Sequence, residues 1–239
     1  MFQVTLSSPI PAVKVKESAH CSGSASARYV MGAPMSDASR LEPLPAPKTK
    51  RGARTRQKIL DAAEREIGRK GFAEASISTI TAEANVGQGT FYLYFRSKED
   101  VLRELVLRMG RRLRRHLTLA VADAPGRLEA ERRGLRAFLE FVRANPDLYR
   151  VVAESQFVDQ AVFRRYYEDF AAGYVKGLRA AERRGEIRKG DAVVHAWALM
   201  GISDMVGRRF ALWDARTSLR RVAEAAFGLI EEGLAPRRD

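Results

Sequence analysis

The sequence is poor in the residues that build disulfides and metal sites. Its 239 residues include one cysteine, Cys21, and three histidines that lie far apart. One cysteine cannot form an intramolecular disulfide, and sparse cysteine fits a reducing cytoplasm. The histidines have no cysteine or second histidine at the spacing that ligates zinc. We therefore expect no metal site.

Long apolar runs are also missing. The first residues contain no continuous apolar stretch of the kind that marks a signal peptide. The best apolar run, 192–202, is interrupted by His195 and is far shorter than the roughly 20 residues that span a bilayer. We therefore expect no membrane span or anchor, and a cytoplasmic location.

Motifs of catalysis are absent too. The chain has no glycine-rich phosphate loop, no G-x-S-x-G elbow, no paired histidines and no Cys–His arrangement. Cys21 lies in the compositionally biased start of the chain, away from any such pattern. The sequence therefore predicts neither an enzyme nor a bound cofactor.

What the sequence has in excess is positive charge. Forty-two lysines and arginines against 29 aspartates and glutamates leave a net charge of +13. Residues 51–115 hold 15 of the basic and 8 of the acidic side chains, so more than half of the surplus lies there. A concentrated basic region indicates a polyanionic partner, and the missing membrane anchor favours nucleic acid.

The first 50 residues differ in composition from the rest. They are rich in serine, alanine and proline without a helical or strand period, which predicts a disordered arm. Beyond Arg54, apolar residues recur at three and four positions almost throughout, and no alternating strand pattern is found. The predicted fold class is all-α. Thr55 is the expected N-cap of the first helix, and Ser97 that of a long basic helix.

An arginine-rich run at 108–115 lies on that long helix. Its arginines point in several directions around a helix, which favours a solvated face over a DNA contact. Leu107 and Leu113 are then expected to face inward.

Two short helices joined by a tight turn precede the long one. They are predicted at 76–84 and 88–95, and Asn85 between them enters the left-handed region more readily than most residues. Ile80 and Phe91 are placed to lock the pair together. This is the pattern of a helix-turn-helix, whose second helix enters the DNA major groove.

The same stretch carries a longer ordered pattern. It runs through Thr55-Arg56, Ile-Leu-x-Ala-Ala at 59–63, Gly71-Phe72, 80–86, 89–95 and 97–102. With these motifs in this order, residues 55–102 resemble the DNA-binding domain of the TetR family of bacterial transcriptional repressors. Thr81 and Asn85 stand where that family usually has alanine and glycine, and both are small or turn-tolerant substitutions.

The resemblance implies which residues meet DNA. Similar repressors use the start of the second helix, the recognition helix and a following lysine, which here are Ser76, Ile77, Ser78, Gln88, Gly89, Thr90, Tyr92, Leu93, Tyr94 and Lys98. The chemistry agrees, because glutamine pairs with adenine, threonine meets a thymine methyl or a phosphate, and tyrosine and lysine contact phosphates. Arg54 is expected to reach along the duplex. The alternative for Tyr92 is packing within the small domain.

Residues 113–235 carry a second group of amphipathic helices, with joints near Pro146, Asp159, 185–191 and 215–217. The candidates for lining a pocket are mostly aromatic: Phe138, Phe141, Tyr149, Phe163, Tyr167, Phe170, Tyr174, Trp197 and Asp204. Such a stripe is either plain core or, as the family resemblance implies, the wall of an inducer pocket. Asp204 is either a polar anchor of that pocket or a partner for Arg208 or Arg209 across a dimer.

The last two helices are expected to form a homodimer. In similar repressors they pair with their copies, and apolar residues on two faces of a terminal helix need a second partner. Residues 144–150, together with Trp197, are similar to family members that respond to acyl-CoA thioesters. A small apolar inducer such as an acyl-CoA is the resulting expectation.

The sequence thus predicts three regions: an arm at 1–50, a DNA-binding domain at 51–112 with its helix-turn-helix at about 75–94, and a ligand-binding and dimerisation domain at 113–235. The expected function is a repressor that an inducer releases from a palindromic operator on double-stranded DNA. The alternative is a non-specific architectural DNA-binding protein, which accounts for the charge but not for the aromatic-rich second domain.

Overall fold

The computed structural model describes residues 47–214 and 216–235, and its regular elements are all helical. These elements are α1 (Lys50–Lys70), α2 (Ile77–Glu83), α3 (Gln88–Tyr92), α4 (Lys98–Ala120), α5 (Arg127–Ala144), α6 (Pro146–Val158), α7 (Gln160–Arg184), α8 (Ala192–Gly207), η1 (Arg208–Leu212) and α9 (Leu219–Leu234). The predicted all-α class is confirmed for this part of the chain. Cys21 and the predicted arm up to residue 46 lie outside it.

The first helix begins earlier than the sequence pattern indicated. Thr49 is the N-cap of α1, and its hydroxyl accepts a hydrogen bond from the Gly52 amide at 3.0 Å. The prediction of Thr55 as the cap is wrong, because Thr55 lies inside α1 and donates its hydroxyl to the Arg51 carbonyl. The predicted cap of α4 is confirmed, since the Ser97 hydroxyl accepts from the Asp100 amide.

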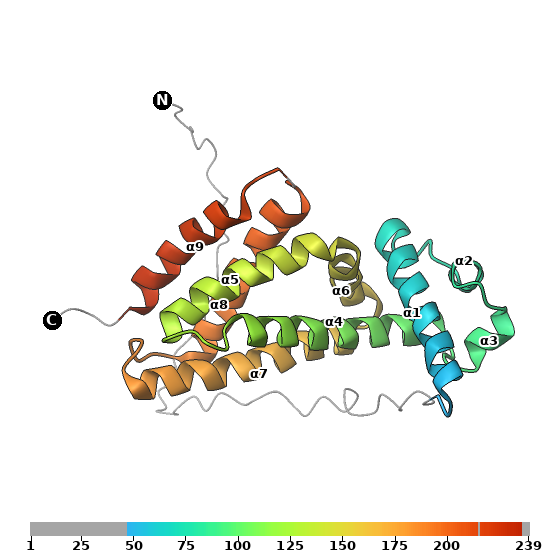
Figure 1. Cartoon of the computed structure of the whole chain (residues 1–239), viewed down its shortest axis with the longest axis horizontal. Helices are drawn as coiled ribbons and strands as arrows, with labels where there is room; N and C mark the ends of the chain where they lie inside the picture. Colours follow the sequence, from blue (N-terminus) through green and yellow to red (C-terminus); the bar gives the residue numbers. More distant parts are fainter. Residues whose placement is uncertain (1–46, 215, 236–239) are drawn as a thin grey trace, which may run out of the picture. The chain divides into compact units, whose positions relative to one another are not determined.

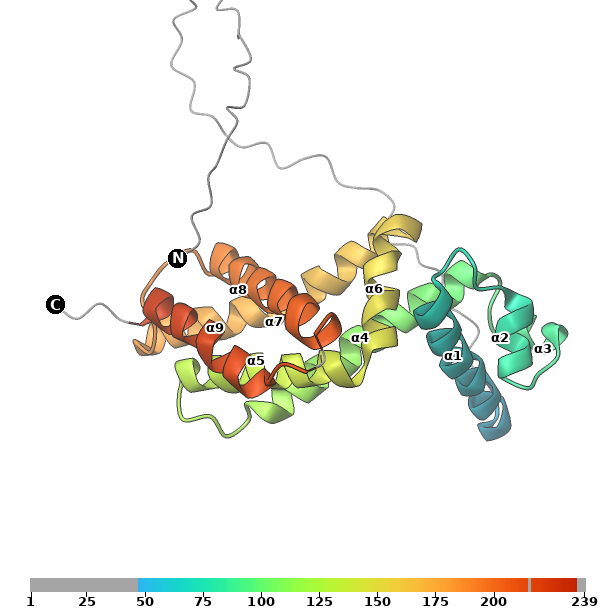
Figure 2. The same cartoon turned by 90° about the horizontal axis from the view of Figure 1, so that it is seen from above.

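The helices form two groups, and both pack against α4. Residues 47–97, here called the head, place α1, α2 and α3 at one end of α4 (Figure 1). Residues 98–235, the body, pack α5, α6 and α7 against the rest of α4 (Figure 2). The predicted boundary at residue 112 falls inside α4, which begins directly after the head and runs unbroken into the middle of the body. One apolar core extends through both groups.

The predicted joints of the body coincide with observed helix ends. Pro146 occupies the first turn of α6, where its missing amide hydrogen costs no helical hydrogen bond. Asp159 caps α7 by accepting from the Val162 amide at 3.0 Å, and Gly185 ends α7 with a left-handed φ of 72°. In the described residues, no helix is long and apolar enough to cross a bilayer.

A π-helical turn, η1, follows α8. Arg143 on α5 holds it, because the guanidinium donates to the carbonyls of Phe210, Asp214 and Thr217. These three contacts fix the path of the chain between α8 and α9.

Candidate DNA interface and effector cavity

The helix-turn-helix forms at the predicted place, but its second helix, α3, ends at Tyr92 and not at the predicted Phe95. Asn85 has a φ of 53°, in the left-handed region, and is the single non-glycine residue of the described chain with a positive φ. Ile80 and Phe91 are fully buried and hold α2 and α3 together. Ser76 starts α2 with a capping box, in which its hydroxyl accepts from the Thr79 amide and the Thr79 hydroxyl accepts from the Ser76 amide.

The predicted DNA-contacting residues differ in how exposed they are. Tyr92 is 57% exposed and Leu93 66% exposed, and one edge contact joins the Tyr92 ring to Phe91, with ring centres 5.4 Å apart. The remaining exposed members are Gln88, Gly89, Ser78 and, on α1, Arg54, whereas Ser76, Ile77, Thr90 and Tyr94 are half-buried. A Cβ placed on Gly89 would meet nothing within 4 Å, so its backbone is open to close approach.

Lys98 has partners inside the protein. Its ammonium donates to the carbonyls of Phe72 at 2.5 Å and Ala75 at 2.6 Å, and it lies 4.2 Å from the centre of the Phe72 ring. The ammonium therefore holds the loop between α1 and α2 against the start of α4. Sequence reasoning predicted only a phosphate contact for this residue.

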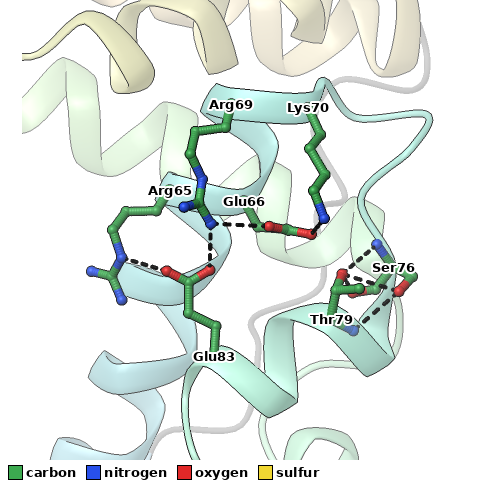
Figure 3. Close-up of polar contacts among 7 residues, drawn as sticks. All are labelled: Arg65, Glu66, Arg69, Lys70, Ser76, Thr79 and Glu83. Atoms are coloured by element: carbon green, nitrogen blue, oxygen red, sulfur yellow. Dashed lines mark hydrogen bonds and ion pairs between the residues drawn. The ribbon is translucent and has the colours of Figure 1, made fainter.

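An ion-pair network joins the end of α1 to α2 (Figure 3). Glu66 is 3% exposed and accepts from Lys70 at 2.7 Å and Arg69 at 3.2 Å. Arg69 also donates to Glu83 on α2, as does Arg65. The hydrogen bond from Lys70 lowers the pKa of Glu66 below its ordinary value of 4.5, although burial acts in the opposite direction.

This network makes the stability of the head depend on acid pH. A lowered folded-state pKa means that ionised Glu66 stabilises the fold above its ordinary pKa, and that this contribution is lost as pH falls through the folded value. We expect Glu66→Gln to be less stable than the wild type near pH 7, with the gap narrowing below pH of about 4.5. Urea unfolding across that range measures the gap.

The matched control is Glu74→Gln, an exposed glutamate without an ion pair among the described residues. Its stability should follow the wild type at every pH. A Glu66→Gln gap that stays constant down to acid pH would show that the network does not act through ionised Glu66.

Most arginines of the 108–115 run are paired on the protein surface. Arg108 contacts Asp61, Arg111 contacts Glu104, and Arg112 donates to Asn145. Leu113 is buried and Leu107 packs against the core, as predicted. Arg114 differs from its neighbours because it turns toward the interior of the body.

A cavity of about 320 Å³ lies inside the body. Its walls come from one face each of α4, α5 and α7, together with residues of α6, α8 and α9. The aromatic members of the lining are Phe138, Tyr149, Tyr166, Tyr167, Phe170 and Tyr174. The volume and the mixture of apolar walls with few polar groups are typical of small-molecule sites.

The structure brings six of the nine predicted pocket residues to this cavity: Phe138, Tyr149, Tyr167, Phe170, Tyr174 and Asp204. It places Phe141, Phe163 and Trp197 outside the lining. Phe141 is buried against the His116 ring, and the Phe163 ring meets Tyr167 edge to face. Trp197 stacks on Tyr167 and is 45% exposed.

Two carboxylates in the cavity wall each hold an arginine and a tyrosine. Asp204 accepts from Arg208 at 2.8 Å and from the Tyr149 hydroxyl. Asp204 therefore has its arginine partner within the same chain.

Glu131 forms the matching group with Arg127, at 2.7 Å, and the Tyr174 hydroxyl. Burial, reinforced by the adjacent carboxylates, raises the pKa of Tyr149 and of Tyr174 far above the usual range. Both hydroxyls therefore remain protonated donors.

Helix α6 connects the cavity to the head. Tyr149 and Val152 line the cavity, while Glu154 on the same helix accepts from the Phe72 amide at 2.5 Å. Gly68 of α1 packs directly on α6, because a Cβ added there would lie 2.7 Å from the Asp147 Cα. Sequence reasoning missed this contact, which depends on tertiary packing; the glycines at positions 68 and 71 were its one visible sign.

The geometry can be compared with known proteins. A family model for bacterial regulatory proteins of the tetR family matches residues 59–105, which span α1 to α4 from the first buried position of the head. Residues 59–105 therefore form a DNA-binding domain of the TetR type. Its helix-turn-helix is therefore that of a DNA-binding transcriptional regulator.

A transcriptional regulator of similar length also matches beyond the head. The chain is 26% identical over 192 residues to the uncharacterized HTH-type transcriptional regulator YdgC of Bacillus subtilis (strain 168), covering 78% of this chain and 96% of that protein.

Two solved TetR-like structures share the fold. The fatty acid degradation regulator FadR from Bacillus halodurans is 22% identical with a TM-score of 0.66, over 73% of this chain and 93% of its own. FadR from Bacillus subtilis in complex with stearoyl-CoA is 21% identical with a TM-score of 0.67, over 74% and 98%.

Proposed function

We propose that this chain is a ligand-responsive transcriptional repressor that binds a palindromic operator as a homodimer and is released by a small apolar inducer such as an acyl-CoA. The observation that carries the proposal is α6, which borders the cavity with one face and contacts the head with another. A repressor acts at the chromosome, so we place the protein in the cytoplasm.

The DNA-contacting surface of the proposal is formed by α3 and the start of α2. Gln88, at the first turn of α3, pairs with adenine, while Thr90, Tyr92 and Tyr94 contact backbone or thymine groups. Ser76, Ile77, Ser78, Gly89, Leu93, Arg54 and Lys98 complete the surface. The Lys98 ammonium has two roles in this proposal. It donates to two carbonyls of the loop between α1 and α2, which positions that loop, and it also contacts a DNA phosphate.

The dimer of the proposal is formed by α8 and α9. Several apolar side chains on these helices are exposed: Val193, Val194, Trp197, Met205 and Leu229. Exposed apolar groups clustered on two neighbouring helices are typical of a protein–protein interface. Two copies then present two α3 helices to successive major grooves, so half-sites lie one helical turn or a multiple of it apart.

An apolar inducer fits the cavity walls. The lining is predominantly aromatic and aliphatic, and the structural neighbour from Bacillus subtilis holds stearoyl-CoA. Ligand binding beside Tyr149 and Val152 acts on α6, whose Glu154 holds the end of α1 in place. The ligand then favours a conformer in which the head is misplaced for DNA binding. The loss of operator affinity equals the difference between the ligand's affinities for the two conformers.

The decisive experiment selects bound sequences from a random duplex pool and then tests the recovered operator. Binding is measured over a salt series on the operator and on a scrambled duplex. Preference for the operator at every salt concentration, lost on adding decanoyl-CoA, supports the repressor. Equal affinity for both duplexes throughout favours a non-specific architectural protein and contradicts the proposal.

Gln88→Ala is expected to weaken operator binding by roughly 1–3 kcal/mol and to relax preference at one base pair, because its bidentate contact is lost. Fluorescence anisotropy on operators varied at single positions measures this. Gln57→Ala on the exposed face of α1 is the matched control and should retain the wild-type preference. Unchanged preference in Gln88→Ala would show that another residue recognises that base pair.

A further inference from the structure

The cavity holds one more cation than anion. Its ionisable lining consists of three arginines and two carboxylates. Arg127 is paired with Glu131, and Arg208 is paired with Asp204. The remaining cation is Arg114 on α4.

Arg114 has no hydrogen bond or ion pair with any residue of the described ranges. Its guanidinium lies in a space left by Gly110, one turn earlier on α4. A Cβ added to Gly110 would come within 3.0 Å of Arg114 Nη1 and 3.3 Å of the Tyr166 ring. The missing side chain at Gly110 therefore lets the guanidinium lie beside Tyr166.

Tyr166 is the second unpaired polar group at this place. It is 7% exposed, it lines the cavity, and its hydroxyl makes no hydrogen bond within the part of the chain described. Burial raises the pKa of Tyr166 above its usual range, and the charge of Arg114 lowers it in part. The hydroxyl is therefore a protonated donor close to the cation.

An arginine and a tyrosine hydroxyl together offer donors and a positive charge without an internal acceptor. Donors without a protein acceptor in a partly buried site favour a ligand that brings its own acceptors. A carboxylate fits best, because guanidinium donors match its two oxygens. By contrast, Tyr149 and Tyr174 have protein carboxylates as acceptors.

We propose that Arg114 and Tyr166 form an anion-binding subsite, and that the effector is an apolar molecule with one terminal anionic group held there. The inference rests on the cavity being the effector site of the proposed function. Apolar residues that continue from this subsite along the walls, Leu113, Leu117, Val121, Phe138 and Phe170, receive the rest of the molecule. The cavity volume of about 320 Å³ lies at the lower end for small-molecule sites, which suits a medium-length chain.

The test compares three probes that share one chain: decanoate, 1-decanol and decanoyl-CoA. Calorimetry on the full-length protein is expected to show binding of decanoate at least tenfold tighter than that of 1-decanol, because only decanoate carries the anion. The decanoyl-CoA titration separates a free carboxylate from the phosphates of a thioester as the source of the negative charge.

Arg114→Gln is expected to weaken decanoate binding about tenfold to a hundredfold, the loss associated with hydrogen bonds to a charged group. The matched control is Arg115→Gln, which removes the same charge from the exposed neighbour on α4 and should leave binding unchanged. Tyr166→Phe should weaken decanoate less than Arg114→Gln does. Arg114→Lys keeps the charge and should keep the preference for decanoate over 1-decanol, so a poorly folding glutamine variant does not block the test.

The outcomes separate the two levels of the proposal. Equal binding of decanoate and 1-decanol, or equal decanoate binding by wild type and Arg114→Gln, overturns the anion subsite and leaves the repressor standing. If none of the three probes binds the wild-type protein or releases it from its operator, both the subsite and the apolar inducer are overturned.

Discussion

Phe91→Ala is expected to remove about 3–5 kcal/mol from the free energy of unfolding, the usual cost of truncating a fully buried phenylalanine. Phe91 is 0% exposed, and its ring packs against the Phe95 ring with the two ring centres 5.6 Å apart. Its loss leaves a cavity beneath α3, a helix of five residues that cannot persist without this packing. Urea unfolding followed by circular dichroism measures the loss, and operator affinity should fall with it.

Tyr92→Ala is the control for this prediction. Tyr92 is the next residue along α3 but is 57% exposed, so its truncation should change stability by no more than about 0.5 kcal/mol. Operator affinity should still fall, because Tyr92 belongs to the proposed DNA surface. If Phe91→Ala lost as little stability as Tyr92→Ala, Phe91 would not be the residue whose packing holds α3 against the rest of the head.

Glu131→Ala is the second substitution with a large expected effect, about 3–5 kcal/mol of destabilisation. The Glu131 side chain is 7% exposed, and it is the carboxylate that pairs with Arg127 and accepts from Tyr174. Removing it leaves a largely buried guanidinium and a buried hydroxyl unpaired in the cavity wall. The free energy of unfolding and the melting temperature should both fall.

Two further variants distinguish charge burial from lost packing. Glu129→Ala, two residues away on α5, breaks ion pairs at a surface where a third of its side chain is exposed, and should cost at most about 1 kcal/mol. The double substitution of Arg127→Met with Glu131→Leu removes both charges and should recover most of the stability lost in Glu131→Ala. No recovery would mean that the pair acts through its shape and not through its charges.

The head could be predicted from the sequence because its determinants are local. Ile80, Asn85 and Phe91 lie within twelve residues, and each meets a requirement of the turn that the printed order already reveals. The start of α1 could not be located in this way. Lys50, Arg51 and Arg54 are basic, and residues 50–54 carry no large apolar side chain. This first part of α1 therefore lacks the apolar spacing from which a helix is predicted.

The body was less accessible to sequence reasoning, because its site depends on which helix faces meet. An aromatic stripe on α7 identified Tyr167, Phe170 and Tyr174 correctly, but nothing local distinguishes them from Phe163, which contacts Tyr167 and does not line the cavity. Arg114 was grouped with a solvated arginine run. Its turn toward the cavity depends on Gly110 and on the position of α7, and only the glycine is visible in the sequence.

Because α4 is unbroken, a small rotation at its cavity end produces a larger displacement at its other end, next to the head. Lys98, which holds the loop of the head, begins the helix, and Arg114 lies 16 residues further along it. At 1.5 Å per residue these positions are about 24 Å apart. A tilt of about 5° around the Arg114 end displaces the Lys98 end by about 2 Å, enough to take a hydrogen bond out of range. In the proposed repressor, a rigid α4 of this length would turn a shift smaller than one bond length at the cavity into a misplaced recognition helix on DNA, without a separate hinge.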